Sequence, residues 1–359
     1  MKLISLNIIL LIAYVLAFPS HALASSAKKA KKYYDEAYEL QNTGHPRQAI
    51  KMFNKVLKLK PDHYWAINNL ALCYHDIGEY DKALASFERI IDIDPMTGVA
   101  HLNRGLTYES MGEYQQAFND YLEAARYPES SLDILYSNIG LLYGKWKGDY
   151  DSAIIFHNKA IEENPEYYYG YTNRAAAHRK LEKYDLAKAD LEKAKAIAPE
   201  SPDVLRGYGH LCSDLKMYDL SIEYYTQAVE AEPNSYYSHY NRGWVYIQTK
   251  EYKKGLTDFE EAIKANPAKS NSYLNRGLCL YYLGQYNKAI EDFKYAIDHD
   301  DNLKYSYNNM ANAYHKLGQP DQACQHWQNA LNHGYEYQPE WKEKYGFDDP
   351  KEMVKQLCQ

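Results

Sequence analysis

The chain has 359 residues, of which 25% are charged and 46% hydrophobic, a balance that is typical of folded proteins and argues against intrinsic disorder. Lysine and arginine total 41 against 48 acidic residues, and this net charge of -7 disfavours a nucleic-acid ligand, which needs a basic surface. The 39 tyrosines favour half-buried or binding surfaces, because each combines an apolar ring with a polar hydroxyl.

The first 24 residues have the pattern of an export signal. Lys2 is followed by an apolar stretch over residues 3–18, Pro19 breaks any helix, and Ala22 and Ala24 supply the small residues that a signal peptidase requires. An uncleaved anchor is the alternative, but the apolar stretch is shorter than the roughly 20 residues that span a bilayer. We therefore predict cleavage near Ala24 and a periplasmic or secreted protein.

Small residues then recur at intervals of 34 residues, with small insertions near Glu129 and Trp146. A second small residue follows each of them by twelve or thirteen positions, which predicts two helices that cross closely within each repeat. Gly-containing turns such as Gly78–Glu79–Tyr80 separate the two helices, and prolines such as Pro267 end the second one. The recurring positions are Ala37, Ala71, Gly105, Gly140, Ala175, Gly209, Gly243, Gly277 and Ala311.

This pattern, with segments such as Tyr240–Asn241–Arg242–Gly243, resembles the tetratricopeptide repeat (TPR) over residues 30 to about 334. The resemblance implies an all-α fold, a right-handed α-solenoid of about nine helical hairpins with a C-terminal capping helix. We expect a signal peptide over 1–24, a solenoid over 25–334 and a cap over 335–359. The repeats are expected at 30–63, 64–97, 98–131, 132–167, 168–201, 202–235, 236–269, 270–303 and 304–334. Two departures, His157 at a usually apolar position and the insertion around Trp146, predict local distortion.

Arginine precedes the recurring small residue in four repeats, and an aspartate follows each arginine by sixteen residues. The other five repeats lack both residues, so the pairing is all or none. We interpret it as an ion pair between the two helices of one hairpin, with a structural rather than a catalytic role. The pairs are Arg104 with Asp120, Arg174 with Asp190, Arg242 with Asp258, and Arg276 with Asp292.

Asparagine lies two residues before the small residue in seven repeats, where the resemblance implies a side chain facing the concave groove. A row of carboxamides can bind the main chain of an extended peptide, although the same asparagines can equally be solvated bystanders. They are Asn69, Asn103, Asn138, Asn173, Asn241, Asn275 and Asn309.

Aromatic side chains are expected on the same face of the first helices, at Trp65, Tyr169, Tyr237, Tyr305 and Trp244. Aromatic anchors among polar groups are typical of binding hot spots, and we prefer Trp65 and Trp244 as groove contacts. Packing against a neighbouring hairpin is the alternative for each of them.

The five cysteines fall into two groups. Cys73, Cys212 and Cys279 lie at packed positions of the first helices and are expected to be buried and free. Cys324 and Cys358 resemble the closing unit of exported repeat proteins, which makes a disulfide between them a candidate in an oxidising compartment. Met353, Val354, Leu357 and Cys358 are expected on one face of the capping helix.

The sequence contains no metal-binding helix motif, phosphate-binding glycine loop or nucleophile elbow. We therefore predict a protein that is not an enzyme and uses no cofactor, metal or small-molecule substrate. Its partners would be other proteins or peptides bound in the groove, with only indirect membrane contact. The alternatives are a structural subunit of a secretion, pilus or polysaccharide-export assembly, and a secreted factor directed at a host.

Overall fold

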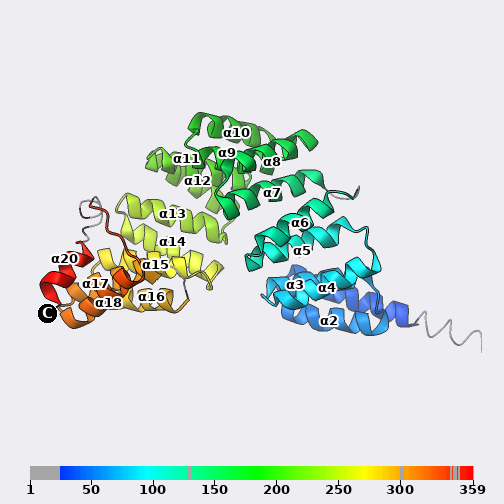
Figure 1. The fold of residues 1–359 in the computed structure, drawn as a ribbon, viewed down its shortest axis with the longest axis horizontal. Helices are drawn as coiled ribbons and strands as arrows, with labels where there is room; N and C mark the ends of the chain where they lie inside the picture. Colours follow the sequence, from blue (N-terminus) through cyan, green and yellow to red (C-terminus); the bar gives the residue numbers. More distant parts are fainter. Residues whose placement is uncertain are drawn as a thin grey trace, which may run out of the picture. The chain divides into compact units, whose positions relative to one another are not determined.

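The structure is a computed structural model that describes residues 25–127, 131–299, 303–339, 342, 346 and 348–358, and every regular element in these ranges is an α-helix (Figure 1). The predicted export signal over residues 1–24, including Ala24, lies outside the described residues. Among the described helices, none combines the length and the apolar character needed to cross a membrane. The chain divides into two compact units, Met1–Asn173 and Arg174–Gln359, with the boundary inside α9 (Tyr168–Lys180).

The first unit consists of antiparallel helix pairs, in which we call the first helix of each pair helix A and the second helix B. Residues 25–42 are helical and pack through Ala30 and Ala37 against α2 (Pro46–Leu59). The following pairs are α3 (Tyr64–Asp76) with α4 (Tyr80–Ile93), α5 (Gly98–Met111) with α6 (Tyr114–Ala124), and α7 (Leu132–Lys147) with α8 (Tyr150–Glu163).

The second unit repeats the arrangement and ends in a single helix. After α10 (Tyr184–Ile197), the pairs are α11 (Pro202–Asp214) with α12 (Tyr218–Ala231), α13 (Tyr236–Gln248) with α14 (Tyr252–Ala265), α15 (Ser270–Tyr282) with α16 (Tyr286–His299), and α17 (Leu303–Lys316) with α18 (Pro320–Asn332). The last described helix is α20 (Pro350–Leu357), which packs on α18. The all-α fold of stacked hairpins that the sequence predicts is confirmed.

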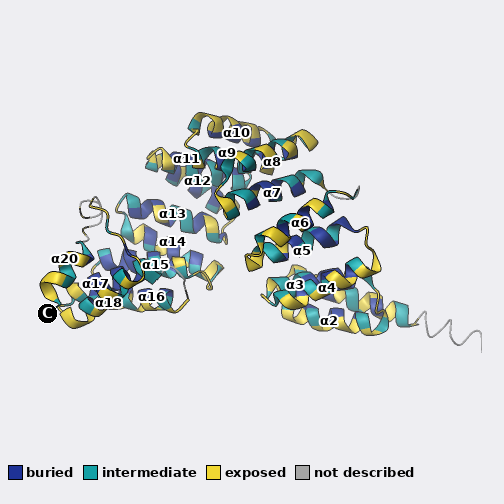
Figure 2. Ribbon diagram, viewed as in Figure 1, coloured by how far each residue is buried: buried dark blue, intermediate teal, exposed yellow. Residues whose placement is uncertain are grey.

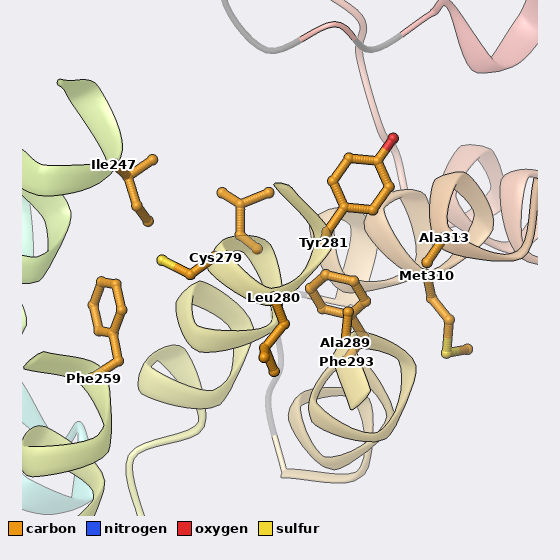
Figure 3. Packing of buried hydrophobic residues seen from close by; sticks show 10 residues of the cluster. Ile247, Phe259, Cys279, Leu280, Tyr281, Ala289, Phe293, Met310 and Ala313 are labelled. Atoms are coloured by element: carbon orange, nitrogen blue, oxygen red, sulfur yellow. The ribbon is translucent and has the colours of Figure 1, made fainter. Parts of the chain in front are cut away.

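The recurring small residues bring the two helices of a hairpin into close contact. A Cβ atom added to Gly277 on α15 would lie 2.7 Å from the ring of Phe293 on α16, which is closer than atoms can approach. The ring of Phe293 is fully buried and packs in one cluster with Cys279, Leu280 and Ala289 (Figure 3). Figure 2 shows the result for each hairpin, with buried residues where helices meet and exposed residues on the opposite sides.

His157 fills the same place in the fourth hairpin that phenylalanine or tyrosine fills in others. Its ring is buried, and a Cβ on Gly140 would lie 2.6 Å from it. The predicted insertion near Trp146 falls within α7, which has 16 residues, and α7 still pairs with α8. Both departures are therefore absorbed inside one intact hairpin.

Helix α20 covers the last hairpin, as the sequence predicts. The side chain of Asp349 accepts a hydrogen bond from the Lys351 amide at 2.9 Å and begins the helix. Met353, Val354 and Cys358 pack against the buried cluster of Ala311, Ala323 and Trp327. Leu357 follows Met353 by four residues and so shares this face, but it is 42% exposed and does not belong to the cluster.

The cysteines occupy the two environments expected of them. Cys73, Cys212 and Cys279 are free and buried, and burial raises the pKa of the Cys279 thiol to about 12, so this thiol stays protonated. Cys324 on α18 and Cys358 at the end of α20 are joined as a disulfide, with Cα atoms 5.5 Å apart. That separation is common for disulfides and requires no displacement of the cap.

Candidate binding site

The four arginine–aspartate pairs tie helix A to helix B within their hairpins. In each pair Nε and Nη2 of the arginine donate to the two carboxylate oxygens, and the aspartate is buried. The Nε and Nη2 distances are 2.8 and 2.7 Å for Arg104 with Asp120, 2.9 and 2.5 Å for Arg174 with Asp190, 2.8 and 2.7 Å for Arg242 with Asp258, and 2.8 and 2.6 Å for Arg276 with Asp292.

A histidine lies beside the aspartate in three of these pairs, and in one of them His178 Nε2 is 3.7 Å from Asp190 Oδ2. His101 Nδ1 lies 3.2 Å from Asp120, and His239 Nδ1 lies 3.0 Å from Asp258. Burial tends to raise the pKa of Asp120, but hydrogen bonds from Arg104 and His101 lower it below its usual value. The pKa of Asp292 is raised, because the effect of burial exceeds the lowering effect of the hydrogen bond and charge of Arg276. The hydrogen bond to Asp258 raises the pKa of His239.

The predicted asparagines connect neighbouring hairpins. Five of them place Nδ2 against a polar group of the preceding helix A: Asn69 on Tyr34 Oη (3.1 Å), Asn103 on Asn68 Oδ1 (3.0 Å), Asn173 on Ser137 Oγ (3.0 Å), Asn241 on His210 Nε2 (3.4 Å) and Asn275 on Tyr240 Oη (3.0 Å). Asn138 is half-buried, while Asn69, Asn275 and Asn309 are buried, so the solvated alternative is wrong for these three. Each of the five amides therefore has only part of its donor capacity left for a ligand.

Four of the five predicted aromatic anchors are exposed. Trp65 is 53% exposed, Tyr169 and Trp244 are each 39% exposed, and Tyr237 is 59% exposed. Tyr305 is partly buried, and its ring centroid lies 5.8 Å from that of Tyr335. The packing alternative therefore does not account for most of the Trp65 or Tyr237 surface, whereas most of the Trp244 surface is buried by packing and 39% of it stays accessible.

Five of the predicted groove residues line one cavity of the second unit, with a volume of about 410 Å³. We call it the Trp244 pocket. Three consecutive A helices, α13, α15 and α17, supply its walls, and the segment after α18 supplies one further residue. Its lining residues are Tyr240, Asn241, Trp244, Asn271, Leu274, Asn275, Leu278, Tyr305, Asn309 and Tyr335. The volume is within the usual range for ligand pockets.

The remaining predicted groove residues do not line this pocket. Tyr237 lies on α13 outside it, and six others belong to the first unit: Trp65, Asn69, Asn103, Asn138, Tyr169 and Asn173. Trp65 and Tyr169 keep the exposure that a contact residue needs, and both lie outside the Trp244 pocket. All five predicted groove residues that line the Trp244 pocket thus belong to the second unit.

Sequence reasoning missed Tyr335, which is 4% exposed and lies beside the pocket residue Tyr305. Gly334, with φ of +78°, ends α18 in the left-handed conformation, and the Tyr335 amide donates to the Ala330 carbonyl at 3.0 Å. Asn308 Nδ2 donates to the Tyr335 hydroxyl at 3.1 Å. The detectable signal was a glycine four residues after Ala330, the last small residue of the repeat, followed directly by an aromatic residue.

His210 lies next to the pocket residue Asn241. Its Nδ1 lies 2.8 Å from the Tyr225 hydroxyl, and its Nε2 contacts the Asn241 amide. Partial burial, reinforced by Arg179 and Arg206, lowers the pKa of His210 to about 3. The ring is therefore neutral at physiological pH and holds Asn241 without adding charge to the site. The part of the chain that the structure describes contains no group of three potential metal ligands.

Comparison with protein families gives one consistent result. Five sequence profiles, each described as tetratricopeptide repeat, match residues 34–96, 99–130, 135–167, 168–201, 207–235, 236–269, 270–303 and 293–325. The matches follow the helix pairs seen in the structure.

Curated relatives share only part of the chain. Over 87 residues the chain is 33% identical to the small glutamine-rich tetratricopeptide repeat-containing protein 2 of Mycosarcoma maydis, covering 24% of this chain and 25% of that protein. Over 56 residues it is 38% identical to an uncharacterized protein of Methanocaldococcus jannaschii, covering 16% of this chain and 65% of that protein. The chain thus spans less than two thirds of the length of either relative.

Solved structures share the fold at low identity. The Cut9–Hcn1 hetero-tetramer of APC/C matches with a TM-score of 0.61 and 14% identity, covering 88% of this chain and 60% of that chain. PilF of Pseudomonas aeruginosa matches with a TM-score of 0.51 and 18% identity, covering 63% of this chain and 96% of that chain. The type IV pilus biogenesis factor PilW matches with a TM-score of 0.51 and 17% identity, covering 64% and 100%.

Replacing one member of a buried ion pair should destabilise its hairpin. In an Asp258→Asn variant, Arg242 keeps its charge but loses the carboxylate, at a cost of about 3 to 5 kcal/mol. Amide hydrogen exchange should therefore accelerate in α13 and α14. The matched control is Glu261→Gln on α14, which breaks the exposed pair with Lys264 and should leave exchange unchanged. Equal protection in both variants would contradict the structural role.

Acid should destabilise the protein partly through His210. Its pKa is about 3 in the folded chain against 6.5 ordinarily, so the unfolded chain takes up a proton first as the pH falls. The stability tied to the neutral ring is complete above about pH 6.5 and declines toward pH 3, by up to about 1.4 kcal/mol per pH unit. Urea unfolding at several pH values should show a shallower acid decline for His210→Gln. The same decline of stability with falling pH in the unaltered chain and in His210→Gln would contradict this assignment.

Proposed function

The chain belongs to the tetratricopeptide repeat family, and from this premise we propose that it is an exported scaffold that binds a segment of another polypeptide. TPR domains bind other proteins or peptides. In this chain the proposed binding surface is formed by the exposed face of the A helices, with the Trp244 pocket as its best-defined part.

The observation that carries this proposal is the convergence of three A helices on one pocket. Helix α13 supplies Trp244, α15 supplies Asn275, and α17 supplies Tyr305 and Asn309. All four side chains line the same cavity. Aromatic rings supply apolar contact area, and carboxamides both donate and accept hydrogen bonds. This combination suits a polypeptide, whose side chains alternate with polar peptide groups.

A binding role rather than catalysis is supported by the kind of groups that line the pocket. Its residues are tyrosine, tryptophan, asparagine and leucine, which position a ligand but are not poised as an activated nucleophile or a charged acid–base pair. We therefore propose a scaffold that needs no cofactor. An assembly subunit of a secretion, pilus or polysaccharide-export machine is the competing role, in which the pocket need not be occupied.

Export is proposed from the signal pattern of residues 1–24 and agrees with the cysteines of the cap. A disulfide between Cys324 and Cys358 persists in an oxidising compartment, where it closes a 34-residue separation. A loop of this length stabilises the cap by up to about 4 kcal/mol in the chain-entropy description. The periplasm and the extracellular medium both meet this requirement.

Truncating the pocket tryptophan should abolish partner capture. Crosslinking in the cells that make the protein, followed by mass spectrometry, should identify a protein whose yield falls at least about tenfold in Trp244→Ala, because central aromatic anchors dominate binding energy. Trp65→Ala tests the exposed tryptophan of the first unit in the same way. The matched control is Trp146→Ala on α7, which should capture the partner normally. Undiminished capture by both Trp244→Ala and Trp65→Ala would favour the assembly-subunit role.

Intact-mass analysis should find an exported chain that begins at Ser25 and contains one disulfide. A peptide map without reductant should link Cys324 to Cys358, while Cys73, Cys212 and Cys279 should react with alkylating agent only after unfolding. An intracellular protein retaining residues 1–24, or free thiols at both Cys324 and Cys358, would overturn the export proposal.

A further inference from the structure

The Trp244 pocket is electrically neutral throughout its lining. Three tyrosines and a tryptophan contribute rings, four asparagines contribute carboxamides, and Leu274 and Leu278 contribute aliphatic surface. A charged side chain entering it would lose water without gaining an opposite charge, which is costly. The chemistry of the lining therefore selects an uncharged ligand group.

We propose that the Trp244 pocket receives an aromatic side chain of the partner polypeptide and that Tyr335 determines this specificity by forming the end wall. The inference rests on the proposed function and adds the chemical class of the group that is recognised. Rings prefer edge and offset contacts with other rings. The pocket offers four such rings, from α13, α17 and the segment after α18: Tyr240, Trp244, Tyr305 and Tyr335.

The position of Tyr335 is fixed by the end of α18. Gly334 turns the chain, the Tyr335 amide is held by Ala330, and its hydroxyl accepts from Asn308. A comparable bond recurs in the stack, where Asn275 Nδ2 donates to the Tyr240 hydroxyl of the preceding hairpin. At the end of the stack, Tyr335 thus makes the corresponding hydrogen bond between a tyrosine hydroxyl and an asparagine amide. Its ring closes the pocket beside α17.

A sugar ring is a poorer fit than an aromatic side chain. A sugar brings several hydroxyl groups that each need a hydrogen bond, but the Asn241 amide contacts His210 and the Asn275 amide is engaged by Tyr240. The leucines offer no hydrogen bonds, and the Tyr240 and Tyr335 hydroxyls already accept from Asn275 and Asn308, which leaves less of the polar capacity of the lining for those hydroxyls. An aromatic side chain needs only apolar contact, and the remaining amide capacity can meet the peptide groups on either side of it.

The test uses small probes and the full exported chain labelled with 15N. N-acetyl-tryptophanamide and N-acetyl-tyrosinamide should shift the indole N–H signal of Trp244, which is assigned from a Trp244→Phe variant. N-acetyl-leucinamide should bind about tenfold more weakly, and the corresponding lysine and glutamate amides and methyl glucoside should cause no shift at the same concentrations.

Variants of the end wall separate specificity from folding. Tyr335→Ala should weaken the two aromatic probes about tenfold and remove their advantage over the leucine probe. Tyr335→Phe keeps the ring and should bind as the unaltered chain does. Tyr337→Ala, in the same segment but outside the pocket, is the matched control and should also bind normally. An unchanged spectrum elsewhere in each variant shows that the hairpins remain folded.

The inference is overturned if the charged amides or methyl glucoside shift Trp244 as strongly as the aromatic amides, if no probe does, or if Tyr335→Ala binds normally. These results differ from failure of the proposed function. Partner capture that depends on Trp244 while no aromatic probe binds would leave the scaffold role standing and remove only the aromatic preference. Aromatic binding without Trp244-dependent capture would do the reverse.

Discussion

The contact between a small residue on helix A and a large buried ring on helix B sets the geometry of these hairpins. Gly209 meets Tyr225 and Gly277 meets Phe293, so closely that a single added carbon at either glycine would collide with the ring. Because interiors are close-packed, such a contact fixes how deeply and at what rotation the helices approach. Neighbouring positions on helix A are consequently held on an outward face, which is where Trp244 lies.

Polar contacts then add direction to this packing. Each arginine fork spans one hairpin, whereas the amides of five asparagines reach the preceding one. Arg242 does both, since its Nη1 also donates to Thr226 Oγ1 on α12 at 3.1 Å. A buried ion pair is weak evidence for net stability, because the desolvation of both charges offsets their attraction. Its geometric effect is clearer: two parallel hydrogen bonds allow only one rotation of Arg242 against Asp258, and therefore one register of α13 on α14.

The structural features that recur at a fixed spacing could be predicted from the sequence. Small residues recurring every 34 positions identified the hairpins, and the joint presence of Arg276 and Asp292 identified a contact between two helices. It did not predict that Asn275 would donate to Tyr240, because a carboxamide suits both a groove and a neighbouring hydroxyl. The exposure of Leu357 was also missed, since at the end of a short helix nothing in the spacing determines which residues the underlying hairpin reaches.

A stack of hairpins must end, and the way this one ends builds the pocket. The final hairpin has no successor to cover α18, so α20 takes that place through Met353 and Val354. To reach it the chain has to turn away from the repeat pattern at Gly334, and that turn places Tyr335 against Tyr305 and Asn308. The wall of the Trp244 pocket is thus a by-product of capping the stack. Because a hairpin inside the stack is followed by another helix A, the equivalent turn belongs to the end of the stack, which explains why the Trp244 pocket lies there.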